Sequence, residues 1–301
     1  MRKIIKKIFW YLVYFSGLNF IYNLFSGPRL ILVGYHSVPA GPQDSQNYAM
    51  LAVAKEIFAK QISYLKNKYR IINFDDIARG TKEGIAIFFD DGFEDNFLIA
   101  RPILKAREVR ATVFLTTDLI SQKDILWTIK LRYLKGASQE TEKLIWRLKD
   151  LPLAQRQRQL AAIFSKFKNP LPKIFMDWEQ MLKAVDVFDY GSHGVTHTDF
   201  DEMGEGELLG ELRESKKEIE QKLRQNVTAL SYPHGKYSEL SVELAKKAGF
   251  QTAVTTRKGV NKNPDLLCLK RISVDPDDDM IIFRLKLGIY YPLSVAIKKF
   301  I

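Results

Sequence analysis

Two adjacent carboxylates at the end of an apolar run are the first residues in this chain whose types and spacing could do chemistry. Residues 85–89 are apolar and lead directly into Asp90, Asp91 and Gly92. A short continuous apolar run is typical of a strand that is buried on both faces of a parallel sheet. Buried charges are costly unless they are paired or bind a metal. One aspartate could cap the following helix, but a cap needs only one carboxylate, so the pair predicts a functional site.

The four histidines of the chain are His36, His193, His197 and His234. His193 and His197 follow a predicted strand and are four residues apart, so on a helical backbone they would share one face and could bind one metal. The alternative is a loop in which both imidazoles make ordinary hydrogen bonds. Two imidazoles and one carboxylate would leave positions on a metal open for water and substrate.

A third polar cluster, residues 231–237, also follows a predicted strand. Pro233 and Gly235 favour a tight loop there. Such a loop can direct a backbone N–H at a developing oxyanion, although by itself the sequence is equally compatible with an ordinary turn.

Together, the three strand ends resemble the motifs of the polysaccharide deacetylase family, the metal-dependent carbohydrate esterases that include the chitooligosaccharide deacetylases. Residues 89–92 (FDDG) resemble the first motif, residues 192–197 the second and residues 232–235 the third. The resemblance extends over residues 30 to 275. Its details are closest to the branch that acts on exopolysaccharides and cell-surface glycans.

The resemblance implies a distorted (β/α) barrel of about seven parallel strands and the removal of acetyl groups from N-acetylated sugars of a polysaccharide or surface-glycan precursor. Asp91, His193 and His197 would hold a divalent metal ion, most often zinc. Asp90 would be the general base. The backbone N–H of His234 would help to bind the oxyanion. An acetylated oligo- or polysaccharide is therefore the expected partner.

Four further residues are expected to contact the substrate or to orient the base. The side chains of His36, Trp127 and Tyr232 would line a sugar cleft, and Arg271 would hold Asp90 through a bidentate pair or contact the substrate.

The chain departs from the family pattern at two positions. Ser231 stands where the third motif often has an arginine, and residues 269–271 (LKR) lack the histidine that often serves as general acid. The proton for a leaving amine would then come from His36, His234 or a water on the metal. Two alternatives therefore stay open: an O-acetyl esterase acting on a glycan, and a catalytically silent glycan-binding barrel protein.

The elements that must position these residues alternate along the chain as strand and helix, which predicts parallel βαβ units and an α/β fold. We expect strands at residues 30–35, 70–72, 85–89, 111–115, 187–191, 228–231, 251–254 and 267–272. We expect helices at residues 53–68, 94–106, 178–184, 206–223 and 238–248. Residues 120–174 interrupt the alternation, with helices expected at 127–134 and 140–167, and we interpret them as a helical insertion that forms a lid or a partner surface.

The composition of the 301 residues, 46% hydrophobic and 27% charged, is that of a globular chain with a sizeable core. The net charge of +11 favours anionic surroundings, such as a membrane surface or an acidic polymer. We find no zinc-finger spacing, aromatic RNA-binding signature or helix-turn-helix, so no nucleic-acid partner is expected. Cys268 is the single cysteine, which excludes an intramolecular disulfide.

The two terminal segments flank the predicted barrel domain, residues 27–275. Residues 1–26 are expected to form a basic and apolar helix, and residues 276–301 a basic amphipathic segment with a helix that could pack on it or share a membrane face. The basic end and the aromatic residues favour binding at a membrane interface, while a signal peptide, a membrane anchor and a helix packed on the domain are the alternatives. We expect a membrane-associated or cell-envelope protein, with a peripheral cytoplasmic location as the alternative.

Overall fold

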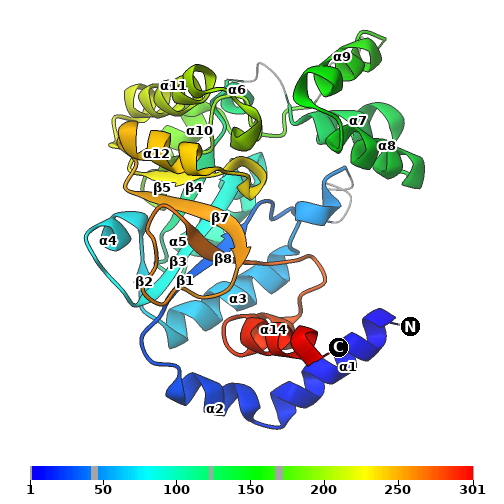
Figure 1. Cartoon of the computed structure of the whole chain (residues 1–301). Coiled ribbons are helices and arrows are strands. Elements are labelled where there is room, and N and C mark those ends of the chain that lie inside the picture. The colour runs from blue at the N-terminus through cyan, green and yellow to red at the C-terminus, as the bar shows by residue number, and fades with distance from the viewer. Residues whose placement is uncertain (1, 42–46, 122–124, 167–171, 301) are drawn as a thin grey trace.

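The computed structural model describes residues 2–41, 47–121, 125–166 and 172–300. Its centre is a closed ring of seven parallel strands, which confirms the predicted distorted (β/α) barrel (Figure 1). The strands of the ring are β1 (Leu30–Tyr35), β3 (Gly84–Asp91), β4 (Ala111–Leu115), β5 (Phe188–Ser192), β6 (Ala229–Ser231), β7 (Thr252–Lys258) and β8 (Leu269–Ser273). Strand β1 pairs with both β3 and β8, and these two pairings close the ring. A two-residue strand, β2 (Ile71–Ile72), pairs with the first half of β3.

The strands are buried on both faces because successive side chains alternate between the barrel interior and the outer layer. Leu30 and Leu32 of β1 belong to the interior cluster, whereas Ile31 and Val33 pack in the larger outer cluster beneath the helices. On β3 the interior row is Ala86 and Phe88, and the next position in that row is Asp90. The alternation therefore directs one aspartate of the pair toward the barrel axis.

Helices cover the outside of the ring and close its amino end. The covering helices are α3 (Lys55–Lys68), α5 (Arg101–Lys105), α6 (Thr117–Ile120), α10 (Trp178–Leu182), α11 (Glu205–Leu223) and α12 (Glu239–Lys247). Helix α4 (Phe74–Ala78), which the sequence analysis did not anticipate, places Phe74 against Phe88 and Phe114 at the amino end of the barrel. Short helical turns η2 (Ala49–Leu51), η4 (Phe200–Glu202) and η5 (Pro233–Gly235) lie in the loops.

The helix expected at residues 94–106 is confirmed, because the backbone is helical without a break from residue 94 to residue 105. A π-helical stretch, η3 (Asn96–Ala100), leads into α5, which has Pro102 in its first turn. Proline lacks the N–H that a continuous α-helix would use at this position, and π-helical stretches accommodate such breaks in the hydrogen-bond ladder.

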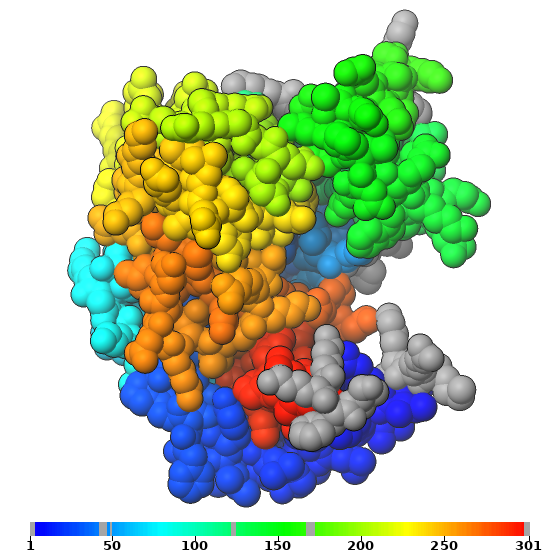
Figure 2. Space-filling view, in the orientation of Figure 1, coloured from blue at the N-terminus to red at the C-terminus, as the bar shows by residue number. Residues whose placement is uncertain are grey.

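The insertion contains three helices where two were expected: α7 (Trp127–Lys135), α8 (Gln139–Lys149) and α9 (Leu153–Phe164). Pro152 precedes α9 and cannot continue α8. The three helices share a small apolar core of their own, made by Leu131, Ile145, Leu148 and Leu160. In Figure 2 the insertion appears as a separate green lobe beside the barrel. The end predicted for this segment, residues 169–172, falls largely outside the described residues.

Each terminal segment forms two helices instead of one continuous helix. Helices α1 (Arg2–Phe15) and α2 (Leu18–Phe25) are separated at Gly17, and α13 (Met280–Lys286) and α14 (Tyr290–Phe300) at Gly288. The expected packing of the two termini is observed, with α14 beside α1 (Figure 1). Trp10 stacks on Tyr290 with ring centroids 4.1 Å apart. Among the described residues no single helix is long and apolar enough to cross a membrane, although the bent pairs α1–α2 and α13–α14 meet that criterion when taken together.

Candidate active site

The polar residues singled out in the sequence gather at the carboxyl ends of the barrel strands. Asp90 and Asp91 are the last two residues of β3, His193 directly follows β5, and His36 directly follows β1. Parallel strands bring their carboxyl ends to one edge, so residues far apart in the sequence meet there. His234 lies in η5, immediately after β6.

Asp91, His193 and His197 form a compact cluster in which one ligand atom from each residue lies within 4.8 Å of the others. Asp91 Oδ1 is 3.3 Å from His197 Nε2 and 3.7 Å from His193 Nε2. These distances exceed those of direct hydrogen bonds between well-aligned partners. The cluster therefore leaves the facing atoms available to a common third partner.

The donor atoms of this cluster fit a divalent metal ion. The Nδ1 of His193 is 2.7 Å from the Ser231 carbonyl oxygen, so Nδ1–H donates to that carbonyl and Nε2 is left with its lone pair toward Asp91. Burial lowers the pKa of His193 to about 4, which keeps the imidazole neutral. Asp91 Oδ1 is buried and has no hydrogen-bond partner in the described part of the chain. One carboxylate and two imidazoles are ligands that zinc and several other divalent ions accept.

Asp90 occupies the interior row beside the cluster and is held by Arg271. Arg271 Nη1 donates to Asp90 Oδ2 at 2.5 Å, and His36 Nε2 is 3.8 Å from the same oxygen. The expected bidentate pair is wrong, because neither Arg271 Nε nor Asp90 Oδ1 has a hydrogen-bond partner among the described residues. Burial raises the pKa of Asp90, but the positive charge of Arg271, together with His193 and His36, outweighs that effect and the pKa is lowered. Asp90 is thus a buried carboxylate with one oxygen free.

The two metal-cluster histidines converge through a loop, and the helical backbone considered in the sequence analysis is absent there. Gly194 has φ 82° and His197 has φ 62°, so the chain turns twice in the left-handed region. Glu211 of α11 fixes this loop: its Oε2 accepts the N–H groups of Val195 and Thr196 at 2.6 and 3.1 Å. A side chain at position 194 would also approach that oxygen to 3.0 Å, which explains the glycine.

Left-handed backbone conformations recur at this site. Six non-glycine residues of the described chain have positive φ, and three of them are Asp91, His197 and His234, with φ 72°, 62° and 51°. Such conformations cost free energy and cluster at functional sites.

A histidine–carboxylate pair that the sequence analysis did not identify lies beside the cluster. His234 Nδ1 is 2.6 Å from Asp199 Oδ1, and the His234 ring centroid is 4.6 Å from that of His197. Burial lowers the pKa of His234, while the hydrogen bond to Asp199 opposes that shift. Asp199 lies two residues after His197, and that proximity to the second motif was the available signal.

A cleft of ≈ 610 Å³ separates the insertion from the loop that carries His197. Trp127 and Trp146 line it from the insertion, and His197, Asp199 and His234 line it from the barrel. The structure therefore places Trp127 beside the cluster, where an aromatic face can meet a sugar ring.

Tyr232 does not line this cleft, and its predicted contact with substrate is wrong. The side chain is 1% exposed, its hydroxyl donates to the Leu267 carbonyl at 3.1 Å, and its ring stacks on Tyr237. An aromatic ring packed in this way belongs to the core and cannot present a face to substrate.

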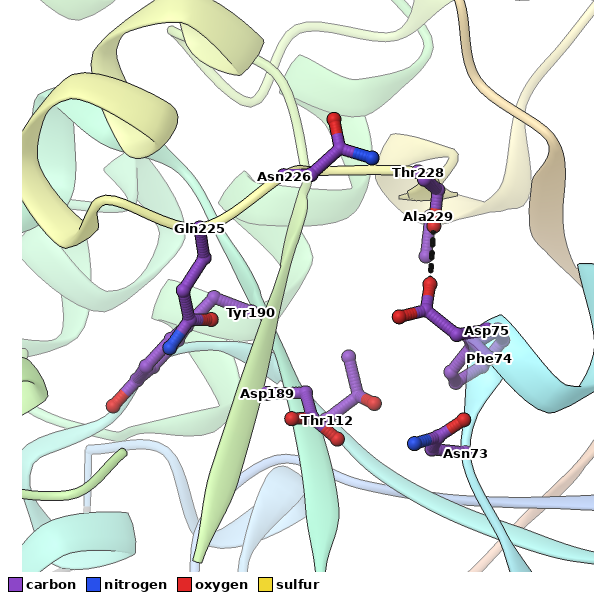
Figure 3. Close-up of a pocket in the computed structure, with 10 residues that line it drawn as sticks. All are labelled: Asn73, Phe74, Asp75, Thr112, Asp189, Tyr190, Gln225, Asn226, Thr228 and Ala229. Carbon is purple, nitrogen blue, oxygen red and sulfur yellow. Dashed lines mark hydrogen bonds between the residues drawn. The ribbon is translucent and has the colours of Figure 1, made fainter. Parts of the chain in front are cut away.

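A second, smaller pocket lies at the opposite end of the barrel (Figure 3). Thr112 and Asp189 line it from the amino ends of β4 and β5, and Thr228 donates to Asp75 across it at 2.8 Å. None of the aspartates and histidines of the carboxyl-end cluster lines this pocket.

Comparison with known proteins agrees with this architecture. The family model described as polysaccharide deacetylase matches residues 78–253. A relative from Bacillus subtilis (strain 168), described as "Putative polysaccharide deacetylase YxkH", is 24% identical over 258 residues that make up 82% of this chain and 72% of the relative.

Two solved structures share the fold. The deacetylase PplD of Streptococcus pyogenes, in complex with acetate, superposes with a TM-score of 0.64 at 20% identity over 87% of this chain and 99% of that one. IcaB from Ammonifex degensii superposes with a TM-score of 0.60 at 17% identity over 87% and 98%. Because the family model spans more than half of the residues and the strand-end motifs lie within or beside it, this chain belongs to the polysaccharide deacetylase family.

Proposed function

We propose that the protein is a metal-dependent hydrolase that removes acetyl groups from N-acetylated sugars of a polysaccharide or a surface-glycan precursor. The observation that carries this proposal is the cluster of Asp91, His193 and His197 next to the free oxygen of Asp90. Family membership supplies the reaction class. The donor set supports a divalent ion, for which zinc is our first choice.

Each residue of the cluster has a distinct role in this proposal. Asp91, His193 and His197 hold the divalent ion, which when bound would polarise the acetyl carbonyl and promote attack by water. Asp90 accepts the proton of the attacking water through Oδ1, because Arg271 already occupies Oδ2. The peptide N–H of His234 is our candidate donor to the developing oxyanion.

The cleft supports a sugar polymer as substrate. Trp127 and Trp146 offer aromatic faces, and Lys149 and Asp150 add groups that can bond to hydroxyls. His36, which was expected to line the cleft, is not among the residues that line it. Its Nε2 is 3.8 Å from the Asp90 carboxylate, and we assign it to contact with the sugar that carries the acetyl group.

The test is acetate release from a panel of N-acetylated and O-acetylated oligosaccharides, first with chelator-treated protein and then with zinc, cobalt or manganese restored. We expect metal-dependent acetate from an N-acetylhexosamine oligomer. Asp90→Asn should reduce the rate by at least about 100-fold, the lower bound for a lost general base. Asp186→Asn, which changes an exposed carboxylate near the amino end of β5, is the matched control and should retain full activity.

Three results would contradict the proposal. Acetate released only from O-acetyl esters would identify an esterase. One equivalent of bound metal without acetate from any substrate would favour a silent glycan-binding barrel. Full activity of purified Asp90→Asn would exclude the assigned base.

A further inference from the structure

Helices α1 and α2 expose an unusual set of large apolar side chains. On α1 these are Ile4, Ile5, Ile8, Phe9, Leu12 and Phe15, and on α2 they are Leu18, Phe20, Ile21, Leu24 and Phe25. Phe15 is 73% exposed and Phe25 is 84% exposed. Single exposed apolar residues are normal on a protein surface, whereas contiguous apolar surface marks an interaction site. We refer to these eleven residues as the terminal apolar face.

On α1 the exposed apolar residues lie opposite the side that docks on the protein. Trp10 and Val13 are buried against Ile282 and Leu285 of α13. At 100° per residue, the six exposed residues of α1 centre about 150° around the helix from that contact. The helix is therefore apolar on both sides, and the domain covers one of them.

On α2 the usual arrangement of a surface helix is reversed. Asn19 is buried, and its side chain accepts from the N–H of Ile289 at 3.1 Å. Asn23 accepts from Arg29 on the same inner side. The amide side chains face the protein and the apolar side chains face outward. A helix with its polar side inward is suited to apolar surroundings.

The charge of this region is one-sided. No aspartate or glutamate occurs before Asp44, whereas Arg2, Lys3, Lys6 and Lys7 open the chain. The ammonium group of Lys7 pairs with Asp279 at 2.8 Å, and Lys6 is exposed. A basic end next to an apolar face matches the surface of an anionic bilayer.

From these observations we propose that α1 and α2 lie in the interface of an anionic phospholipid bilayer, with the terminal apolar face inserted and the remainder of the chain outside. The two helices meet at 60°. The 14 residues of α1 rise only about 21 Å, short of the roughly 30 Å hydrocarbon core. Association with a second copy is disfavoured because it would bring two basic segments together. In Figures 1 and 2 the helices form the blue lower edge of the molecule, away from the insertion. The proposal does not depend on the enzymatic activity.

Vesicle flotation with the full-length protein tests this proposal directly. We expect binding to vesicles of 70% phosphatidylcholine and 30% phosphatidylglycerol, and weaker binding to pure phosphatidylcholine or at high salt. The double variant Phe15→Ser/Phe25→Ser should lower the bound fraction at least about tenfold, because two inserted aromatic rings are lost. Leu182→Ser/Leu240→Ser, which removes two apolar side chains exposed elsewhere, is the matched control and should bind as the unaltered chain does.

Further measurements separate the competing occupants of the face. Unchanged binding by the Phe15→Ser/Phe25→Ser variant would overturn the proposal, provided that its melting temperature matches that of the unaltered chain. A stable dimer without lipid, dissociated by the same substitutions and unable to float, would identify a second copy as the occupant. Protein that alkaline carbonate releases from membranes supports in-plane binding, and protein that resists release would indicate a spanning arrangement.

Discussion

Two neighbouring aspartates, Asp90 and Asp91, acquire different surroundings because the backbone leaves the extended conformation at the second of them. Asp90 still follows the alternation of β3 and faces the barrel interior, where Arg271 meets it. Asp91 has φ 72°, which departs from the extended conformation and brings its carboxylate to His193 and His197. A single change in backbone conformation thus separates a candidate base from a candidate ligand.

The buried pair of Asp90 and Arg271 makes the first prediction at the residue scale. Arg271→Met should lower the free energy of unfolding by about 3–5 kcal/mol, because a buried carboxylate is left without its partner. It should also reduce kcat, since Oδ2 is no longer held. Urea denaturation and steady-state kinetics measure the two effects, and Arg271→Lys should restore part of both.

The double variant Asp90→Asn/Arg271→Met distinguishes stability from catalysis. Removing both charges should recover most of the stability lost in Arg271→Met, because no unpaired buried charge remains. Activity should stay at least about 100-fold below that of the unaltered chain. If Arg271→Met unfolded at the same denaturant concentration as the unaltered chain, the pair would not be the stabilising contact that its geometry indicates.

At the scale of elements, helix α11 positions the loop that carries His197. Glu211 is 8% exposed and accepts two backbone N–H groups of the loop, and its Oε1 accepts the Thr196 hydroxyl at 2.7 Å. The helix and strand β5 also share the hydrogen bond between Ser192 and Ser215, 2.7 Å between hydroxyl oxygens. The loop that carries His197 is therefore held by hydrogen bonds to helix α11 as well as by its connection to strand β5.

Glu211→Gln should weaken zinc binding about 10- to 100-fold, the usual cost of losing an outer support of a metal ligand. An amide cannot accept at both ends, so part of the hydrogen bonding to the loop is lost. Competition with a fluorescent zinc chelator measures the affinity. Glu214→Gln, exposed on the same helix, should bind zinc normally, and an unchanged affinity in Glu211→Gln would show that the loop holds its shape without this carboxylate.

The sequence predicts the strands and the strand-end residues well because both depend on local pattern. Strands β1 and β3 are continuous apolar runs, and His36 and the aspartate pair stand at their ends. The break between α8 and α9 at Pro152 was also visible locally, since proline interrupts the ladder of a helix. Glu211 was not predictable, because its role depends on the packing of α11 against a loop 15 residues earlier. The predicted substrate contact of Tyr232 was wrong for a different reason. The position of a residue within a motif does not determine whether its side chain faces the cleft or the core.

At the scale of the whole molecule, barrel closure is what assembles the site. His36, Asp90 and Arg271 come from β1, β3 and β8, and the pairing of β1 with both neighbours brings them to one place. The candidate metal ligands come from β3 and the end of β5, with β4 between them. A bound ion would therefore link segments about 100 residues apart in the sequence, and its binding energy would act on the stability of the closed barrel.

Metal removal should accordingly lower the melting temperature of the whole chain. A ligand that binds the folded state alone adds about 2.7 kcal/mol of stability at 100 times its Kd. For domains of this size each kcal/mol corresponds to roughly 2–4 °C, so zinc should raise the melting temperature of chelator-treated protein by at least about 5 °C. Differential scanning calorimetry measures the shift, and His193→Ala should abolish it without changing the secondary structure seen by circular dichroism. Equal melting temperatures with and without zinc, at a concentration that saturates any site, would mean that the cluster of Asp91, His193 and His197 does not bind this ion in the folded barrel.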